Sequence, residues 1–450
     1  MNLEDKIKTK TARICVIGLG YVGLPLATGF AKRGYQVVGL DVDEKKVAAI
    51  GRGESYINDV AGKDVASLVE SGRLSATTDY DVLRQVDVAF ICVPTPFDEM
   101  KAPDLSFVVA AAEGIAPRLR AGQLVILQST TYPGTTEEVV LPILERSGLK
   151  AGRDFHLAFS PERINPGDRL HTVENTPKVV GGLTPRCAEL ARQLLAQLTP
   201  QVHVVSSPRA AEMTKLLENI YRSVNIALVN ELALLCERMG IDIWEVIEAA
   251  STKPFGFMPF YPGPGVGGHC IPVDPYYLSW KAREYDFYTK FIELAAEVNQ
   301  DMPVHVVEKV VEGLNGQGKS LRGARILILG VAFKPNVDDA RNSPAQRVME
   351  LLLTRGAEVS YNDPYVPRFK VGRDVFYRDE VVLESVDLTE KRLSASDCVV
   401  IVAGHDCYDY EWIVRHAPLV VDTVNATKGV SKRDKVLRIG APRRTTDRGK

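Results

Sequence analysis

Residues 13–41 constrain the fold of this chain more than any other stretch of its sequence. An apolar run at 13–17 leads directly into GLGYVG at 18–23, and a helical segment follows and ends at Gly34. A second apolar run, 36–40, stops at Asp41. Glycines at this spacing let the backbone approach a pyrophosphate at a helix N-terminus, and an acid about 20 residues later can accept hydrogen bonds from an adenosine ribose. Although the glycines could form a purely structural turn, the whole stretch predicts a dinucleotide site that includes Gly18, Gly20, Tyr21, Val22 and Gly23.

Asp41 also predicts which dinucleotide is bound. NADP carries a phosphate on its adenosine ribose, and a carboxylate at this position would repel that phosphate. We therefore expect NAD as the cofactor.

The apolar runs after Asp41 alternate with helical or loop segments. They lie at 86–93, 124–128, 155–159 and 178–181, and such alternation is typical of a doubly wound α/β sheet. Because open α/β sheets bind ligands at the carboxyl ends of their strands, we expect the polar loops after these runs to form one site with the glycines at 18–23. Three such loops carry Thr95, Thr131, Glu162 and Arg163.

Residues 209–239 show a long helical pattern that ends at Gly240. Lys215 and Asn219 lie four residues apart, so they share one face of this helix, although a solvated face would also explain the pair. A second helical stretch covers about 275–314. Two helical stretches between α/β segments predict a domain that bridges those segments and joins subunits.

The loop at 263–275, GPGVGGHCIPVDP, lies between the two helical stretches. Its glycines permit a close backbone approach and positive φ angles, and its prolines stiffen the chain, so the loop has a defined shape. Cys270 lies at its centre, and Asp274 follows four residues later. A cysteine exposed on a rigid loop suits a nucleophile, whereas the alternative is an inert thiol buried beside a tight turn. The composition of the loop favours the nucleophile.

The α/β pattern starts again after a linker at 316–323. Apolar runs lie at 324–330, 357–361, 398–402 and 419–422, and no GxGxxG follows the first of them. This second nucleotide-type fold would therefore hold a nucleotide differently or only pack against its partner domain. The predicted fold class is α/β, with two Rossmann-like doubly wound domains joined by a central helical domain. The expected bounds are 1–206 for the NAD-binding domain, 207–314 for the central domain and 315–450 for the C-terminal domain.

Composition and charge exclude several classes of protein. With 450 residues the chain is long enough for two or three domains, and its net charge of −2 gives no argument for nucleic acid or an anionic membrane as partner. No apolar run reaches the roughly 18 residues needed to span a bilayer, and the polar residues 1–11 are unlike a signal peptide. The 7 cysteines include no CxxC pair, which favours reduced thiols in the cytoplasm and no metal site.

Longer motifs carry a more specific signal than any single residue. They read GLGYVGLPLA, VPTP, STTYPGTT, FSPERINPG, EMTKLLENIYRSVNIALVNE, GPGVGGHCIPVDPYYL and GVAFKPNVDDARNSP, in this order along the chain. Together they resemble the UDP-glucose/GDP-mannose dehydrogenase family over essentially the whole sequence. PERINPG and GGHC stand where UDP-glucose enzymes usually carry a PEFLREG-like segment and GGSC. These two motifs are most similar to the branch that oxidises UDP-N-acetylhexosamines, with UDP-N-acetylglucosamine as the expected substrate.

The resemblance implies a four-electron oxidation in which a sugar CH₂OH becomes a carboxylate, with two NAD and one water. Cys270 would form a thiohemiacetal and then a thioester, and Glu162 would assist its hydrolysis. Lys215 and Asn219 would stabilise the oxyanion, with Lys215 also moving protons and Asp274 ordering the water network. Thr131 would position water or the cofactor.

The family also implies binding residues and an assembly. A homodimer or larger homo-oligomer in the synthesis of surface polysaccharide is expected. Cofactor contacts are expected from Thr95, Thr131 and Arg341, and substrate contacts from Glu162, Arg163, Lys215, Asn219, Tyr261, Gly267 and Lys334.

The sequence departs from the family pattern at two places. Relatives with the PEFLREG-like segment carry a second glutamate where this chain has Pro166, so Glu162 alone would supply that carboxylate. Many relatives carry an arginine soon after the Asp422-Thr423 step, but Val424 and Asn425 follow here. The substrate contact of that arginine is therefore left without an assigned residue.

Other substrates and one other class of protein remain as alternatives. UDP-N-acetylmannosamine and UDP-glucose are the alternative substrates, because the geometry of the pocket decides the stereochemistry accepted at C2 and C4. A non-catalytic nucleotide-sugar binding protein could use the same scaffold. The presence of Cys270, Lys215 and Asp274 favours an enzyme.

Overall fold

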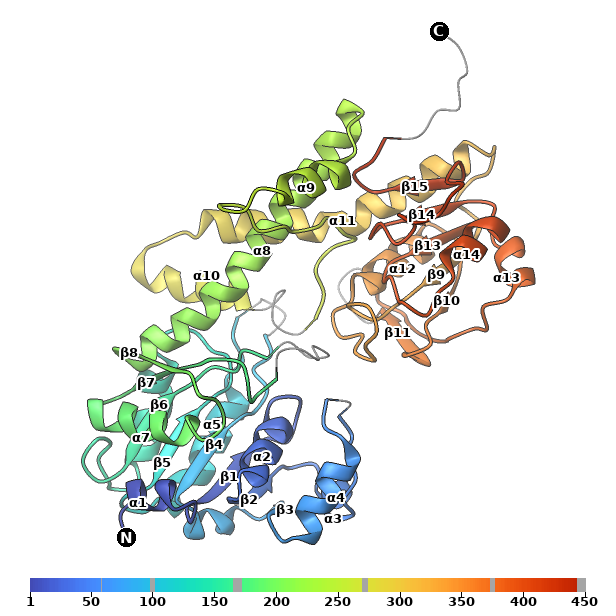
Figure 1. The fold of residues 1–450 in the computed structure, drawn as a ribbon. Helices are drawn as coiled ribbons and strands as arrows, with labels where there is room; N and C mark the ends of the chain where they lie inside the picture. Colours follow the sequence, from blue (N-terminus) through green and yellow to red (C-terminus); the bar gives the residue numbers. More distant parts are fainter. Residues whose placement is uncertain (58, 98–101, 165–171, 269–273, 373–376, 443–450) are drawn as a thin grey trace. The chain divides into compact units, whose positions relative to one another are not determined.

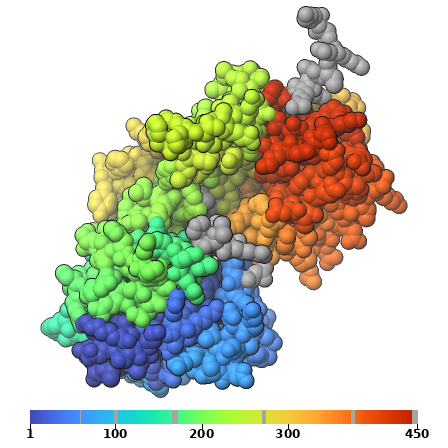
Figure 2. Space-filling model, viewed as in Figure 1, coloured from blue at the N-terminus to red at the C-terminus, as the bar shows by residue number. Residues whose placement is uncertain are grey.

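The computed structural model describes residues 1–57, 59–97, 102–164, 172–268, 274–372 and 377–442. The chain divides into two compact units. We name them the N-terminal unit, Met1–Glu218 with Tyr276–Tyr288, and the C-terminal unit, Asn219–Pro275 with Thr289–Lys450. In the space-filling view, the residues coloured blue to green form one continuous body, as do the residues coloured orange to red (Figure 2). The division into three domains stays a prediction.

The N-terminal unit is built on an eight-stranded sheet in the order β3-β2-β1-β4-β5-β6-β7-β8. Neighbouring strands are parallel except β6 and β7, which are antiparallel. The strand order reverses between β1 and β4, which is where sheets of this kind bind their ligands. The strands are β1 (Arg13–Ile17), β2 (Gln36–Leu40), β3 (Leu74–Thr77), β4 (Val88–Ile91), β5 (Leu124–Leu127), β6 (His156–Phe159), β7 (Lys178–Gly182) and β8 (Val202–Val205).

Successive residues of these strands pack into different cores on the two faces of the sheet. In β1, Ile14 and Val16 belong to one core, whereas Cys15 and Ile17 belong to the other. Because helices cover both faces, the strands are apolar almost throughout, as the sequence predicted (Figure 1). The first core is covered by α1 (Leu3–Lys8), α2 (Gly23–Lys32), α3 (Glu44–Gly51), α4 (Gly62–Glu70) and α7 (Pro185–Leu195), and the second by α5 (Ser106–Ile115) and α6 (Leu141–Glu145).

The chain between the two sheets is helical. It forms α8 (Pro208–Met239), α9 (Ile243–Ser251), α10 (Asp274–Ala282) and α11 (Lys290–Asn315). The predicted long helix is confirmed in α8, which ends before Gly240 with its φ of 73°. The predicted second helix is wrong in one respect, because it is broken between α10 and α11. Asp286 there has a φ of 52°, a left-handed conformation that an α-helix cannot contain.

The C-terminal unit holds a parallel five-stranded sheet in the order β10-β9-β13-β14-β15 and a separate antiparallel pair, β11-β12. Ile326 and Ile328 face a core shared with α11 and α12, whereas Leu327 and Leu329 face one shared with α13 and α14. The elements are β9 (Arg325–Leu329), α12 (Pro344–Thr354), β10 (Glu358–Asn362), β11 (Arg368–Gly372), β12 (Glu380–Glu384), α13 (Glu390–Ala395), β13 (Cys398–Ile401), α14 (Tyr410–His416), β14 (Val420–Asp422) and β15 (Val436–Arg438).

The predicted α/β fold class is confirmed. Helix α12 starts after Ser343, whose Oγ accepts the Ala345 N–H at 3.2 Å. The sequence did not predict β3, β8, β11, β12 and β15. These strands are short, and β8 and β12 have no fully buried residue, so their apolar signal is weak. In the described part of the chain, no helix is long and apolar enough to cross a membrane.

Candidate active site

The glycine turn between β1 and α2 leaves room for a phosphate. A Cβ on Gly18 would lie 2.6 Å from the carbonyl oxygen of Cys92, and one on Gly23 would lie 1.8 Å from the carbonyl oxygen of Gly18. Only glycine fits at these two close approaches. Around Gly20, in contrast, an added Cβ would meet no heavy atom within 4 Å. The turn at the N-terminus of α2 therefore fits the pyrophosphate of NAD.

Asp41 follows β2 and is fixed against the glycine turn. Its Oδ2 accepts the Leu19 N–H at 2.8 Å and lies 3.2 Å from Lys46 Nζ. Its Oδ1 accepts the Asp43 N–H at 3.0 Å. The carboxylate thus lies at the carboxyl end of β2, where dinucleotide folds hold the adenosine ribose, and its contact with a ribose stays a prediction.

The loops after β4 and β5 bring Thr95 and Thr131 to the same edge of the sheet. Thr95 Oγ1 donates to the carbonyl oxygen of Thr130 at 2.7 Å. Thr131 is buried, and its Oγ1 has no hydrogen-bond partner among the residues that the structure describes. An unpaired buried hydroxyl costs about 1–3 kcal/mol, so Thr131 fits a site where a bound group supplies the missing partner.

Helix α10 packs on these loops within the N-terminal unit. Tyr277 is fully buried, and its hydroxyl donates to the carbonyl oxygens of Thr95 and Pro96. Lys281 Nζ lies 2.7 Å from Glu138 Oε2 and 5.2 Å from the centre of the Tyr132 ring. The helix that follows the Cys270 loop is therefore anchored to the edge that fits the cofactor.

Glu162 is buried after β6 and its two oxygens are filled. Oε2 accepts from Gln128 Nε2 at 2.7 Å and from Lys178 Nζ at 2.8 Å. Oε1 accepts the N–H groups of Arg163 and Ile164 at 2.8 and 3.1 Å. Burial alone would raise the pKa of Glu162, but the charge and hydrogen bond of Lys178 and the two backbone N–H groups hold it below its usual value.

Arg163 is tied to its surroundings by two contacts. Its Nη1 donates to the carbonyl oxygen of Pro177 at 2.8 Å, and its Nη2 lies 2.6 Å from Glu218 Oε1 on α8. Two of its five donors are thus used inside the protein. Arg163 stays available to a substrate only through the remaining donors.

Helix α8 carries Lys215 into the interior of the N-terminal unit. The side chain is buried, yet it forms no hydrogen bond or ion pair with any described residue. One turn earlier, Glu212 is fully buried and accepts the N–H groups of Gly134 and Thr136 at 2.6 and 2.9 Å. Glu212 therefore holds the loop after β5 against the helix that carries Lys215.

Asn219 and Asp274 meet in the C-terminal unit. Asn219 Nδ2 donates to Asp274 Oδ2, and Arg222 Nη2 donates to Asn219 Oδ1 at 2.6 Å. An arginine has no acceptor, so its contact fixes which atom of the amide is oxygen. The orientation leaves the second N–H of the Asn219 amide for another acceptor.

The part of the 263–275 loop before residue 269 is held by the segment 341–342. The Gly268 N–H donates to the carbonyl oxygen of Arg341 at 3.1 Å, and Asn342 Nδ2 donates to that of Gly268 at 3.1 Å. A Cβ on Gly267 would meet Pro344 at 2.8 Å, so a larger residue would not fit. Arg341 itself forms a bidentate pair with Asp339, with Nη2 at 2.6 Å from Oδ2.

Lys334 and Tyr261 also lie in the C-terminal unit. Lys334 Nζ is 5.5 Å from the centre of the Phe333 ring, in the loop after β9. Tyr261 is more than half exposed and stacks on Trp244 with ring centres 6.0 Å apart. An exposed ring stacked on a buried one is available to a ligand.

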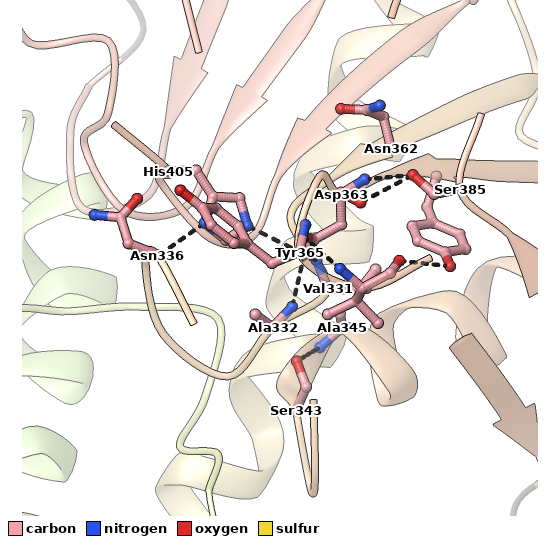
Figure 3. A network of polar contacts seen from close by, with 12 residues as sticks. Val331, Ala332, Asn336, Ser343, Ala345, Asn362, Asp363, Tyr365, Ser385 and His405 are labelled. Carbon is pink, nitrogen blue, oxygen red and sulfur yellow. Dashed lines mark hydrogen bonds and ion pairs between the residues drawn. The ribbon is translucent and has the colours of Figure 1, made fainter. Parts of the chain in front are cut away.

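The loop after β9 is braced by Asp363 and His405 (Figure 3). Asp363 Oδ2 accepts the N–H groups of Val331 and Ala332 at 2.7 and 3.0 Å. His405 Nδ1 accepts the Asn336 N–H at 2.9 Å, which leaves Nε2 to donate to Asp363 Oδ2 at 3.1 Å. Asp363 follows β10 as Asp41 follows β2, but its oxygens are consumed by its own chain. The bonds within its own unit therefore give Asp363 a role in bracing the loop after β9.

The structure places the predicted residues in two groups. Cys270 and Pro166 lie outside the described residues. The N-terminal unit brings together Gly18, Gly20, Tyr21, Val22, Gly23, Asp41, Thr95, Thr131, Glu162, Arg163 and Lys215, and the C-terminal unit holds Asn219, Asp274, Tyr261, Gly267, Lys334 and Arg341.

Several residues that shape the site were not predicted. Gln128, Lys178 and Glu212 each contact a predicted loop from a distant part of the sequence. Lys178 offered one signal, because it is a charged residue at the start of an apolar run. His405 offered another, since it follows an apolar run just as the predicted site loops do.

Three family models match the chain along most of its length. They are described as the NAD binding domain, the central domain and the UDP binding domain of the UDP-glucose/GDP-mannose dehydrogenase family. They match residues 12–199, 209–301 and 327–429, respectively.

Individual relatives agree with these matches. The chain is 43% identical over 359 residues to the UDP-N-acetyl-D-glucosamine 6-dehydrogenase of Pseudomonas aeruginosa, which covers 79% of this chain and 84% of that protein. It is 36% identical over 401 residues to the UDP-N-acetyl-D-mannosamine dehydrogenase of Methanococcus maripaludis, and this match covers 88% of this chain and 87% of that protein. The solved structure of the UDP-D-ManNAc dehydrogenase from Pyrococcus horikoshii matches with a TM-score of 0.86 at 33% identity, over 95% of this chain and 99% of that one. The chain therefore belongs to the UDP-glucose/GDP-mannose dehydrogenase family and is an NAD-dependent nucleotide-sugar dehydrogenase.

Proposed function

We propose that this chain is a UDP-sugar 6-dehydrogenase that oxidises UDP-N-acetylglucosamine to its uronic acid for surface polysaccharide synthesis. The alcohol, two NAD and one water give the carboxylate, two NADH and three protons. Bound NAD supplies the hydride acceptor for both oxidations.

One observation carries the proposal: two buried polar groups of the N-terminal unit lack partners among the described residues. Thr131 Oγ1 is a buried hydroxyl without a hydrogen-bond partner among the described residues, and Lys215, only 7% exposed, forms no hydrogen bond or ion pair with any of them. An unpaired buried hydroxyl costs about 1–3 kcal/mol, so a folded protein keeps such a group mainly where a ligand completes it. A carbonyl or alkoxide oxygen of the substrate is the acceptor that an ammonium and a hydroxyl would bind.

The roles of the residues follow from their chemistry. Cys270 would add to the C6 aldehyde, and water would later release the thioester as the acid. Lys215 would stabilise the oxyanion and take up or return the alcohol proton. Asn219, whose amide is oriented by Arg222 and Asp274, would donate its second N–H to the same oxygen.

Binding roles complete the proposal. Gly18, Gly20, Tyr21, Val22, Gly23 and Asp41 would hold NAD with Thr95 and Thr131, and Arg341 would assist them. Lys334, on the loop braced by Asp363 and His405, would contact the UDP-sugar with Tyr261 and Gly267. A homo-oligomeric state and a cytoplasmic location stay predictions.

The preference for UDP-N-acetylglucosamine rests on the relative from P. aeruginosa at 43% identity. Arg163 gives this preference little support. Its contacts with Pro177 and Glu218 use donors that would otherwise be available to an acetamido group. UDP-N-acetylmannosamine is the second candidate, because the M. maripaludis relative and the P. horikoshii structure bear that activity in their names.

The substrate is tested by NAD reduction with a panel of UDP-sugars. We expect kcat/KM for UDP-N-acetylglucosamine to exceed that for UDP-glucose roughly ten- to a hundred-fold, because a pocket built for an N-acetyl group leaves buried donors unpaired without it. Equal or better activity with UDP-glucose would reject the preference. A higher value for UDP-N-acetylmannosamine would keep the reaction and change the substrate.

The covalent mechanism is tested with Cys270→Ser. Serine is a poor nucleophile here, so oxidation should stop at the aldehyde or at a trapped adduct, while the Kd for NAD stays near that of the unmodified enzyme. Product analysis by mass spectrometry distinguishes these stages. Cys407→Ser, which changes an exposed free thiol, is the matched control and should retain full activity. Complete conversion to the uronic acid by Cys270→Ser would exclude the thioester.

A further inference from the structure

Two asparagines of α8 contact the described residues at the two ends of the 263–275 loop. Asn219 Nδ2 donates to Asp274 Oδ2, and Asn230 Oδ1 accepts the Gly263 N–H at 2.9 Å. The two asparagines lie 11 residues apart, which is about three helical turns and about 16 Å along the helix axis. They therefore share one face of α8, and both are fully buried.

The side-chain amide of Asn230 has one possible orientation. Its Nδ2 donates to Asn299 Oδ1 on α11 at 2.9 Å, and Asn299 Nδ2 donates to the carbonyl oxygen of Ser223 on α8 at 3.1 Å. At one end of this series stands the Gly263 N–H, which only donates, and at the other end a carbonyl oxygen, which only accepts. These two ends fix which atom of each amide is the oxygen. The oxygen of Asn230 is therefore kept toward the loop.

Helix α11 makes a second contact with the same loop. Pro303 lies inside this helix and has no N–H to donate to the carbonyl oxygen of Asn299, its usual partner in an α-helix. A Cβ on Gly265 would lie 3.2 Å from that oxygen and 3.6 Å from Pro303 Cδ, and Gly265 has a φ of 126°. Both features favour glycine. The loop thus rests on α11 between its contacts at Gly263 and Gly268.

We propose that Asn230 is a positioning residue that sets the first part of the 263–275 loop against the face of α8 that carries Asn219. The side chain of Asn299 acts one step further away, because it orients the Asn230 amide. The effect on the reaction rests on the function proposed above, in which Asn219 donates to the reacting oxygen and the loop carries the nucleophile. Such groups must be held within about 0.5 Å of their productive positions, and one helix face serves as the reference for both.

The contact with the loop is tested first without substrate, by hydrogen exchange read by mass spectrometry. In Asn230→Ser the short hydroxyl cannot reach the Gly263 N–H, so peptides that cover 263–268 should contain an amide that exchanges roughly tenfold faster. Asn225→Ser is the matched control. Asn225 is partly exposed on the same helix, and its amide donates to the carbonyl oxygen of Tyr221 at 2.7 Å. This variant should leave exchange in 263–268 unchanged.

Two variants of equal size separate positioning from general stability. Asn230→Asp puts an oxygen against Asn299 Oδ1, whereas Asn299→Asp keeps an acceptor for Asn230 and loses only the donor to Ser223. Both introduce a buried carboxyl group, so both should lower the free energy of unfolding. Near neutral pH, only Asn230→Asp should lower kcat, by about 10- to 100-fold with little change in the KM for NAD, because the loop is misplaced. Asn299→Asp should keep kcat within about threefold.

The pH dependence of Asn230→Asp provides a second signature. Burial beside another oxygen raises the pKa of the new carboxyl group. Its protonated form can again donate to Asn299 while its other oxygen accepts from Gly263. The kcat of this variant, relative to the unmodified enzyme, should therefore rise as the pH falls. Asn225→Asp should show no such dependence.

Equal losses of kcat in Asn230→Asp and Asn299→Asp would overturn the proposal, because both would then act through stability. An unchanged kcat in Asn230→Ser would do the same. If Asn230→Asp fails to fold, Asn230→Ser, which adds no charge, takes its place in the kinetics and should show the same fall in kcat. If the unmodified enzyme oxidises no UDP-sugar, the proposed function is wrong, while the exchange of 263–268 still decides whether Asn230 holds the loop.

Discussion

At the scale of single residues, the hydrogen-bond partners of buried polar groups separate two kinds of side chain. Glu162 and Asp363 are buried with their oxygens filled, so they stabilise the loops around them. Thr131 and Lys215 lie inside the unit without partners among the described residues, which agrees with the ligand contacts proposed for them. Burial alone would not distinguish the two kinds, because all four residues are inside the protein.

The residue-scale prediction concerns Asp41 and the choice of cofactor. The unmodified enzyme should prefer NAD over NADP by roughly a hundred-fold or more in kcat/KM, because the carboxylate repels the ribose phosphate. Asp41→Ala should narrow the gap, since it removes the repulsion and leaves Lys46, now 3.2 Å from Asp41 Oδ2, without its partner.

The control for this prediction is the double variant Asp41→Ala with Lys46→Met. If Lys46 causes the higher kcat/KM for NADP that is expected in Asp41→Ala, the double variant should lose this increase. Steady-state kinetics with both cofactors measure the effect, and similar kcat/KM values for NAD and NADP in the unmodified enzyme would contradict the role of Asp41.

At the scale of elements, α10 packs on the loops of the N-terminal unit that fit the cofactor. The helix starts at Asp274, within the 263–275 segment, and its side chains contact the segments after β4 and β5 through Tyr277, Trp280 and Lys281. The sequence placed the helix but gave no indication of these contacts.

The element-scale prediction is that Tyr277→Phe loosens α10. The change keeps the buried ring and removes a hydroxyl that donates to Thr95 and Pro96. The free energy of unfolding should fall by about 1–3 kcal/mol, because two buried carbonyl oxygens lose their donor. We also expect kcat to fall more than the KM for NAD rises, since the glycine turn is untouched.

Denaturant unfolding and steady-state kinetics measure these two effects. Tyr288→Phe is the matched control, because Tyr288 is 66% exposed in the same unit. An equal loss of stability in both variants would show that the buried hydroxyl has no special role.

At the scale of the whole molecule, each unit has its own sheet and its own cores. Proteins built in this way often unfold in more than one step.

In the C-terminal unit, burial alone would raise the pKa of Asp363, but the hydrogen bonds from His405 and the backbone hold it below its usual value. A carboxyl with a lowered pKa stabilises the folded state above its unfolded pKa, and this contribution is lost as the pH falls through the folded value.

The prediction at this scale is that Asp363→Asn destabilises only the C-terminal unit. The loss should be on the order of 3 kcal/mol near neutral pH, because an amide cannot accept all the bonds that the carboxylate accepts. The difference from the unmodified protein should shrink as the pH falls below about 4, where the unmodified Asp363 loses its advantage.

Hydrogen exchange read by mass spectrometry localises this effect. Faster exchange should appear in β9, β10 and the loop after β9, while the strands of the N-terminal unit keep their rates. Asp406→Asn, a change at a more exposed aspartate of the same unit, should leave exchange in β9 and β10 unchanged. Faster exchange across both units in Asp363→Asn would contradict independent units.

The sequence by itself determined the features that depend on neighbouring residues. The sequence predicted a strand, a glycine turn, a helix and a second strand ending at Asp41 within residues 13–41. These features are local, because they depend on the close backbone approach that glycine permits and on the length of each apolar run. The same holds for the long helix α8 with Gly240 after it. The motifs quoted from these segments were also enough to identify the family.

Only the tertiary structure decided the features that depend on how distant segments pair. The apolar run at 178–181 has the same composition whether its strand runs parallel or antiparallel, so the contact of Lys178 with Glu162 could not be read from it. The same reason hid the contacts of Tyr277 with Thr95 and of His405 with Asp363. Strand direction and register are set by packing and by long connections, and these act between residues that no local pattern links.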